Sequence, residues 1–169
     1  MVDLILRQYR FNYLYAEALV SNLSEHQMTE VPSGGLINHP AFTLGHLVSG
    51  SALIVQNLGG NFNLPEGWKE LFLRKGPGDS TLPEKDTSLY PTKIALLQEL
   101  KRQHLTVEEC LLNTDIEQLS MPKKWRFSSY MPTLIDSIVF LSVNHEAMHL
   151  GQLAAWRRAM NLPSALAKL

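Results

Sequence analysis

The strongest structural signal in this sequence is the stretch His145-Glu-Ala-Met-His-Leu-Gly-Gln-Leu-Ala-Ala-Trp-Arg-Arg-Ala-Met-Asn-Leu-Pro163. Its apolar residues recur every three or four positions, which is typical of an amphipathic helix. The same spacing continues upstream, so we expect one helix from Pro132 or Thr133 to Met160. Asn161 tolerates the left-handed conformation that follows many helices, and Pro163 blocks continuation. Arg157 and Arg158 in the last turn are expected to complement the helix dipole.

Two histidines four residues apart give this helix its chemical interest. Positions 145 and 149 lie about 40° apart around a helix and one turn along it, so both imidazoles can reach one cation. At about 100° per residue they share an apolar stripe, whose members are Ile138, Leu141, His145, His149, Gln152 and Trp156. Two core-facing histidines without a ligand would each need a hydrogen-bond partner. We therefore predict that His145 and His149 are metal ligands, with Glu146 about a quarter-turn away.

A third ligand is needed, because open metal sites usually have three protein ligands. His46 is the best candidate on the residues alone, since it lies in a predicted helix with Phe42, Ser49, Gly50 and Leu53 on its face. The small residues there allow close helix approach and leave room above the imidazole. An ordinary buried histidine is the alternative interpretation of His46.

The other histidines receive different interpretations. His39 precedes Pro40 at a helix entrance, where capping or exposure is expected. His104 lies among apolar neighbours of another helix and is a fallback ligand. His26 lies in a polar turn and is expected to be exposed to solvent.

The string His145-Glu146-x-x-His149 also matches the zinc-peptidase pattern, in which the glutamate is the general base. That pattern normally needs a further ligand downstream, and no His, Asp or Glu follows His149. The β-sheet that accompanies such sites is also missing from the predicted elements. A metal-dependent hydrolase is therefore the weaker alternative.

Three more helices and one long irregular segment complete the predicted fold. We expect helices at about 3–23, 40–58 and 91–111, and an irregular stretch at 61–90 with one short helical candidate at 66–72. The first helix has apolar residues that we expect to supply its packing surface: Leu4, Tyr9, Phe11, Leu14, Tyr15, Ala18 and Leu19. We find no strand pattern and no repeat. The sequence predicts a single all-α domain over residues 1–169, a four-helix bundle with a long crossover between its second and third helices.

Composition narrows the class of partner. The net charge of −1 provides no basic field for nucleic acid, and no apolar run approaches a membrane span. The one cysteine, Cys110, lies in an apolar helical pattern and is expected to be a small core residue. Charge interrupts the first residues too early for a signal peptide. We predict a cytoplasmic protein that binds neither nucleic acid nor membrane.

Taken together, these motifs resemble the DinB-like (YfiT) metalloprotein superfamily. The superfamily signature His-x-x-x-His-x-Gly-Gln, followed by Arg-Arg and a Gly-x-Pro-like ending, is similar to residues 145–163, with Asn161 in place of the usual Gly. Leu44-Gly-His46-Leu resembles the motif that supplies the first ligand in the second helix. The order of elements agrees over essentially the whole chain.

The resemblance implies a four-helix bundle, commonly a homodimer, with one divalent cation of nickel or zinc type on His46, His145 and His149. Three imidazoles do not identify the metal, because Ni, Zn, Cu and Fe all accept them. Characterised members look like thiol-dependent transferases that use low-molecular-weight thiols such as bacillithiol or mycothiol and act on small electrophiles. The alternative is a non-catalytic metal-binding or stress protein. Gln152, one turn beyond His149, is a candidate to support that ligand, or else to form a helix-packing hydrogen bond.

Overall fold

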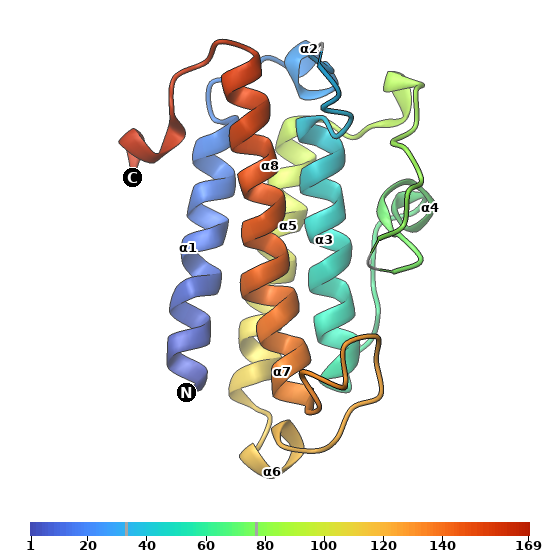
Figure 1. The fold of residues 1–169 in the computed structure, drawn as a ribbon, viewed down its shortest axis with the longest axis vertical. Helices are drawn as coiled ribbons and strands as arrows, with labels where there is room; N and C mark the ends of the chain where they lie inside the picture. Colours follow the sequence, from blue (N-terminus) through green and yellow to red (C-terminus); the bar gives the residue numbers. More distant parts are fainter. Residues whose placement is uncertain (33, 77) are drawn as a thin grey trace.

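Four long helical segments lie side by side in the computed structural model, which describes residues 1–32, 34–76 and 78–169 (Figure 1). They are α1 (Val2–Val20), α3 (Pro40–Asn57), α5 (Lys93–Leu112) and a continuous segment made of α7 (Leu134–Val139), η2 (Phe140–His145) and α8 (Glu146–Ala159). Within the described residues there is no strand, only an isolated bridge between Pro122 and Thr133. The prediction of an all-helical protein is confirmed.

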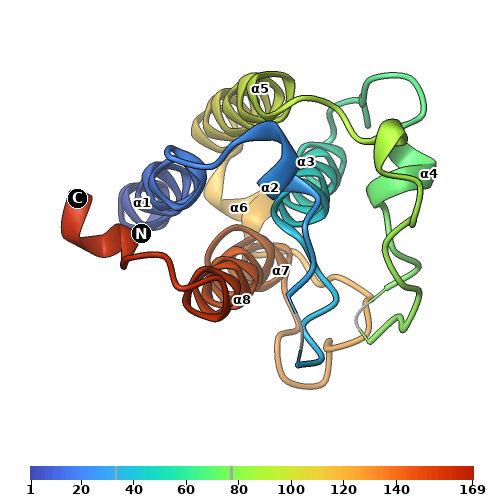
Figure 2. The same cartoon turned by 90° about the horizontal axis from the view of Figure 1, so that it is seen from above.

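Short elements connect the long ones. They are α2 (Glu25–Met28), α4 (Trp68–Phe72), η1 (Thr87–Leu89), α6 (Ile116–Leu119) and η3 (Ala165–Lys168). The connection from α3 to α5 carries α4 and η1 and runs along the outer side of α3, as the view from above shows (Figure 2). The short helix expected at 66–72 is therefore present, beginning at Trp68. None of the described helices has both the length and the apolar character that crossing a membrane requires.

Side-chain caps explain where several helices begin. The Thr92 hydroxyl accepts a hydrogen bond from the Ala95 N–H at the start of α5, and Thr133 forms a capping box with Asp136 at the start of α7. After α8, Asn161 adopts the predicted left-handed conformation, with φ 56°. The first helix ends at Val20 rather than Leu23.

The packing surface predicted for α1 is partly wrong. Leu4, Phe11 and Leu14 are exposed, at 58%, 47% and 50%. The buried face instead runs through Ile5, Tyr9, Asn12, Ala16 and Leu19. Because α1 has apolar residues on most of its circumference and a polar Asn12 on its inner face, hydrophobic periodicity alone does not identify the buried side.

Arg157 lies in the last turn of α8, as predicted, and has a further role that the sequence did not indicate. It is 1% exposed, and its guanidinium donates to the Leu19 carbonyl (2.7 Å), the Asn22 side chain (2.9 Å) and the Pro163 carbonyl. A buried cation needs such acceptors. Arg157 therefore ties the end of α1 to the segment after α8, whereas only the exposed Arg158 is left to face solvent at the helix end.

The long helix predicted from Thr133 to Met160 contains a π-helical turn, η2, that the sequence did not reveal. The Asn12 amide, which is 7% exposed, donates to the carbonyls of Ser142 (3.1 Å) and Val143 (3.3 Å) in this turn. A π turn disturbs the ordinary ladder of helix hydrogen bonds and often occurs at functional sites. Here its last residue is His145.

Candidate metal centre

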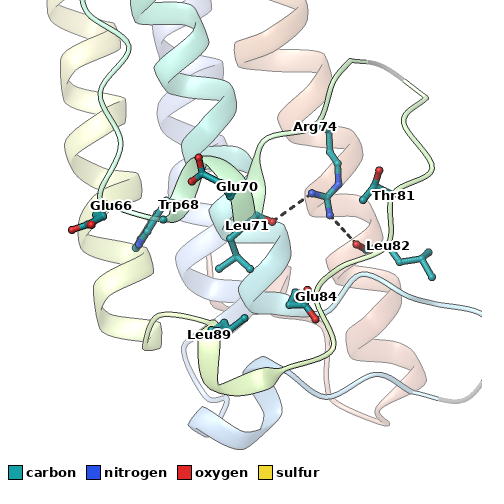
Figure 3. A pocket seen from close by; sticks show the side chains of 10 residues that line it. Glu66, Trp68, Glu70, Leu71, Arg74, Thr81, Leu82, Glu84 and Leu89 are labelled. Carbon is teal, nitrogen blue, oxygen red and sulfur yellow. Dashed lines mark hydrogen bonds between the residues drawn. The ribbon is translucent and has the colours of Figure 1, made fainter.

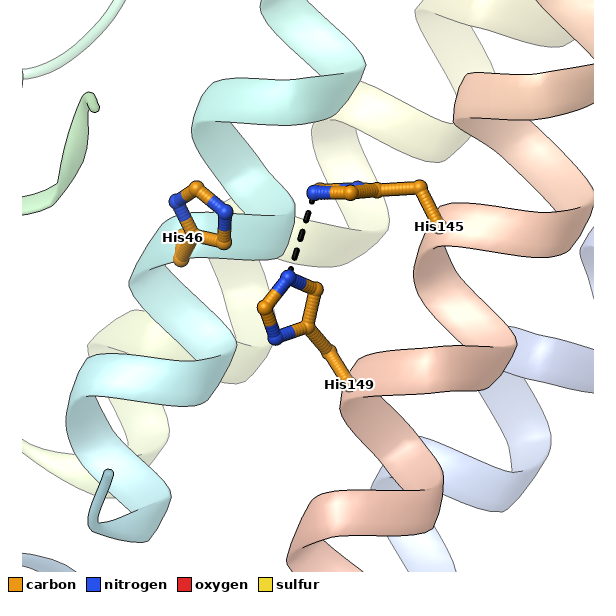
Figure 4. Close-up of side chains that lie close together, drawn as sticks. All are labelled: His46, His145 and His149. Carbon is orange, nitrogen blue, oxygen red and sulfur yellow. Dashed lines mark hydrogen bonds between the residues drawn. The ribbon is translucent and has the colours of Figure 1, made fainter. Parts of the chain in front are cut away.

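Three histidines from two separate helical segments meet in one cluster (Figure 4). His46 comes from the middle of α3, His145 from the junction of η2 and α8, and His149 from the next turn of α8. The ring centroids lie 4.5 to 5.1 Å apart. One ligand atom from each residue lies within 4.8 Å of the others, so the cluster could hold a metal ion. The structure thus brings together the three residues that the sequence singled out.

The spacing of the nitrogen atoms fits a shared cation. The Nε2 atoms of His145 and His149 are 3.1 Å apart. Two nitrogens that each lie about 2.0–2.1 Å from one metal, at octahedral or tetrahedral angles, are separated by roughly 2.8–3.4 Å. At this distance two unprotonated lone pairs would repel each other unless a proton or a cation lies between them.

Hydrogen bonds on the other side of two rings set their orientation. The His46 Nδ1–H donates to the Phe72 carbonyl at 3.0 Å, which leaves Nε2 as the free nitrogen. The His149 Nδ1 lies 3.1 Å from the Gln152 side-chain oxygen. Gln152 therefore contacts His149, as predicted, although the Gln152 side chain is exposed to solvent. Such partners fix the tautomer of metal-binding histidines. The buried Nδ1 of His145 has no partner among the described residues.

Burial keeps the three imidazoles neutral at neutral pH. Desolvation lowers the pKa of His145 to about 3, with His149 and His46 nearby adding to the shift. Burial also lowers the pKa of His149 to about 4 and moves that of His46 in the same direction. Metals bind only unprotonated imidazole, so these residues need not lose protons to bind a cation.

One glycine of α3 makes room for the cluster. A Cβ at Gly45 would lie 2.3 Å from the Phe72 ring, so this glycine lets α4 approach closely enough for the Phe72 carbonyl to reach His46. Gly50 faces the His145 ring, but a Cβ there would lie 3.7 Å away, which is an ordinary contact distance. Among the small residues near His46, the predicted close approach is therefore seen at Gly45.

The cluster opens onto a cavity of about 380 Å³. Its walls come from α3, from the connection after α4, and from the η2–α8 segment, and they are mainly apolar: Phe42, Leu53, Phe140, Leu141 and Met148. Arg74 and Asp79 of the connection are the charged residues among the described lining residues. A cavity of this size accommodates a small molecule.

His104, the fallback ligand, lies outside this cluster. Its Nε2 is 3.0 Å from the Glu146 carboxylate, and both side chains are almost fully buried. The Tyr9 ring stacks on the His104 ring at 3.7 Å, and the Tyr9 hydroxyl is 2.7 Å from Ser51. This pair lies in the core and away from the cluster, and one hydrogen bond joins the two side chains, although the His104 Nδ1 and the second Glu146 oxygen have no partner among the described residues.

Glu146 turns into the core, not into solvent. It is 2% exposed and is absent from the described lining of the cavity. Burial raises the pKa of its carboxyl, while His104 acts in the opposite direction. A zinc-peptidase site would need this carboxylate beside the metal, whereas Glu146 lies against His104 in the core.

The remaining candidates have structural roles. His39 is 3% exposed and caps α3 by accepting a hydrogen bond from the Phe42 N–H, so capping is confirmed and exposure is wrong. His26 is exposed, as predicted, but lies in the short helix α2. Cys110 is half-buried rather than fully buried, and burial raises the pKa of its thiol.

Comparison with known proteins agrees with the geometry. The family model of the DinB superfamily, a superfamily known for metal binding, matches residues 8–153. This range includes all three clustered histidines. No curated protein and no solved structure matches the chain.

Proposed function

The chain belongs to the DinB superfamily, and we propose that it holds one divalent cation of nickel or zinc type on His46, His145 and His149. The observation that carries the proposal is the convergence of three neutral imidazoles within 4.8 Å of one another at the wall of a cavity. Gln152 and the Phe72 carbonyl support His149 and His46 from behind. Such a set leaves further coordination positions open to a small molecule.

We further propose that the chain is one domain with the four-helix bundle of this superfamily, residues 58–92 being its long crossover. The side-by-side arrangement of α1, α3, α5 and α8 supports this architecture. A homodimer is proposed as well, supported by the apolar side chains that α1 exposes, namely Leu4, Phe11 and Leu14. Sedimentation of the purified protein tests the dimer, and a monomer at micromolar concentration would refute it.

For the reaction, we propose thiol S-transfer to small electrophiles. A divalent cation with open positions binds a thiol and favours its thiolate, which is the nucleophilic form. No cysteine lines the cavity within the described residues, so the thiol comes from a second small molecule. Asp79, the carboxylate at the cavity, accepts hydrogen bonds from the Lys75 and Thr81 N–H groups and from the Thr81 hydroxyl. These bonds favour the ionised carboxylate and make it a weaker base. This supports thiol transfer over hydrolysis assisted by a base.

Metal content tests the first part. Gently purified protein is compared by elemental analysis with a triple variant, His46→Ala, His145→Ala and His149→Ala. We expect about one equivalent of metal in the parent protein and none in the variant. Equal metal content in the two proteins would overturn the proposed centre.

Thiol transfer tests the second part. Protein loaded with nickel or zinc is incubated with a panel of low-molecular-weight thiols and a model electrophile, and the thioether product is quantified. We expect product that depends on both metal and His149. Metal binding without turnover across the panel would instead favour the alternative, a metal-binding protein without catalysis.

A further inference from the structure

Arg74 occupies a distinctive place beside the candidate metal centre. Its guanidinium carbon lies 4.4 Å from the centroid of the Phe42 ring. The Phe42 ring in turn stacks on the His46 ring, with centroids 5.8 Å apart and planes 10° from parallel. Arg74 and His46 line the same cavity. One aromatic ring therefore links a cation to a predicted metal ligand.

The guanidinium retains unused hydrogen-bonding capacity. Its two terminal nitrogens donate to the carbonyls of Leu71 at 3.4 Å and Leu82 at 3.3 Å, as Figure 3 shows. An arginine has five N–H donors, so most of them have no acceptor among the described residues. The two existing bonds are also long for N–H···O contacts. They orient the group without saturating it.

No described carboxylate forms an ion pair with Arg74. Asp79 lines the same cavity, but its oxygens accept from the Lys75 N–H (2.9 Å), the Thr81 N–H (2.8 Å) and the Thr81 hydroxyl (2.6 Å). Glu70 and Glu84 line the neighbouring cavity of about 390 Å³ with Arg74, and neither is paired with it. A half-buried arginine without an ion partner, held over an aromatic ring, is well suited to bind a planar anion from a ligand.

The charge of the cavity also favours an anionic ligand. Three neutral imidazoles leave a divalent cation uncompensated, and Asp79 is the one carboxylate among the described residues that line this cavity with Arg74. We propose that Arg74 is a specificity-determining residue that binds a carboxylate of the molecule held at the histidine cluster. This inference rests on the proposed function and names its substrate class, a small thiol whose flat or short apolar body, packed along Phe42, ends in a carboxylate.

A pair of probes isolates the carboxylate. Metal-free protein is loaded with Co²⁺, and its thiolate-to-cobalt absorption band is titrated with 3-mercaptobenzoate or with the uncharged 3-mercaptobenzamide. The meta arrangement prevents one probe from chelating the metal through both groups. We expect the acid to bind about tenfold more tightly than the amide, as for a charge-assisted bidentate contact.

Variants assign that preference to Arg74. In Arg74→Gln the acid and the amide are expected to bind equally, with the amide affinity unchanged. Arg74→Lys is expected to retain only part of the preference, because lysine lacks the planar fork. Arg7→Gln, the same charge change at an exposed residue of α1 that pairs with Asp3, is the matched control and is expected to keep the tenfold ratio.

Two outcomes would overturn the inference. One is an equal affinity of the parent protein for the two probes. The other is a preference for the acid that survives in Arg74→Gln, since it would then come from the metal or from the overall field. Failure of Co²⁺ to bind at all is a different result, because it refutes the proposed metal centre instead of the role of Arg74.

Discussion

His145 and Glu146 are neighbours in the chain, yet they belong to two polar clusters with opposite properties. His145 joins His46 and His149 at the wall of a cavity, where its Nδ1 has no described partner and its Nε2 faces another imidazole nitrogen. Glu146 joins His104 in the core, where the His104 Nε2 lies 3.0 Å from the Glu146 carboxylate and the Tyr9 ring stacks on His104. A histidine paired with a carboxylate has its nitrogen engaged by an acidic partner. Two imidazole nitrogens that face each other across 3.1 Å need a proton or a cation between them, and together with His46 they could hold a metal ion.

The largest effect is expected from removing a histidine of the first cluster. His149→Ala leaves two imidazoles and should weaken metal binding by more than about 100-fold, since even changes behind the ligands cost 10–100-fold. His104→Gln, whose amide still donates to Glu146, is the matched control. It should retain the parent affinity for Zn²⁺ in competition with a chromophoric chelator. Equal losses of metal affinity in the two variants would show that the His46–His145–His149 cluster and the His104–Glu146 pair do not differ in metal binding.

Changes to the His104–Glu146 pair should affect the stability of the fold rather than metal binding. Glu146→Ala leaves His104 buried without its partner and should lower the free energy of unfolding by about 3 kcal/mol. Glu146→Gln keeps a hydrogen-bond acceptor and should cost about 1 kcal/mol. Urea unfolding of metal-free protein measures both. A loss within about 0.5 kcal/mol for Glu146→Ala would mean that the pair is not a stabilising element of the core.

Acid should destabilise the metal-free protein through the first cluster. An unfolded histidine takes up a proton near pH 6.5, whereas burial lowers the pKa of His145 to about 3 and that of His149 to about 4. The unfolded state therefore binds more protons between about pH 6.5 and 4, and stability is lost as the pH falls through this window. The slope reaches about 1.4 kcal/mol per pH unit for each histidine.

A double variant provides the control for this pH dependence. His145→Gln with His149→Gln removes both groups and should flatten the curve measured by chemical unfolding at a series of pH values. The slope that remains is expected from His46 and from His39, whose pKa burial lowers to about 4. An unchanged slope in the double variant would show that the two imidazoles do not resist protonation in the folded protein.

The smallest effect is expected at Gln152, which contacts His149 from the solvent side. Gln152→Ala removes the oxygen that accepts from Nδ1 and should weaken metal binding by about tenfold or less, the lower end of the range for such supporting residues. Stability should change by less than about 0.5 kcal/mol, because the side chain is exposed. Gln152→Glu keeps the acceptor and should preserve the affinity. A variant that unfolds would instead assign Gln152 to helix packing.

Local patterns in the sequence predicted the helices and the grouping of the three histidines well. Helical spacing placed His145 and His149 on one side, and the family motif around Leu44 added His46. Thr133 and Asn161 mark the two ends of the last long helical segment, because helix capping depends on residues that are close together in the sequence.

Long-range pairings were not predictable in the same way. Nothing near Glu146 in the sequence indicates that His104, 42 residues away, is its partner. Nor does the spacing around Arg74 indicate that the connection folds back over Phe42. The buried side of α1 was also misjudged, since its inner face depends on Asn12, whose partners are carbonyls 130 residues further along. Contacts of this kind depend on tertiary packing and leave no periodic trace in the sequence.

The π turn at Phe140–His145 has a consequence for how this segment can change by insertion or deletion. A wide turn contains one residue more than an ordinary α-helical turn, while the helix continues on both sides of it. Removing a single residue there would leave an ordinary α-helix and keep the residues on either side close to their present directions, whereas the same deletion in an α-helical turn would rotate everything after it by about 100°. A deletion at Phe140 or Leu141 should therefore leave the imidazole of His145 at the cavity and the carboxylate of Glu146 in the core. The amide of Asn12, on a different helix, donates to two carbonyls of this turn and would lose one of these acceptors if the turn became α-helical.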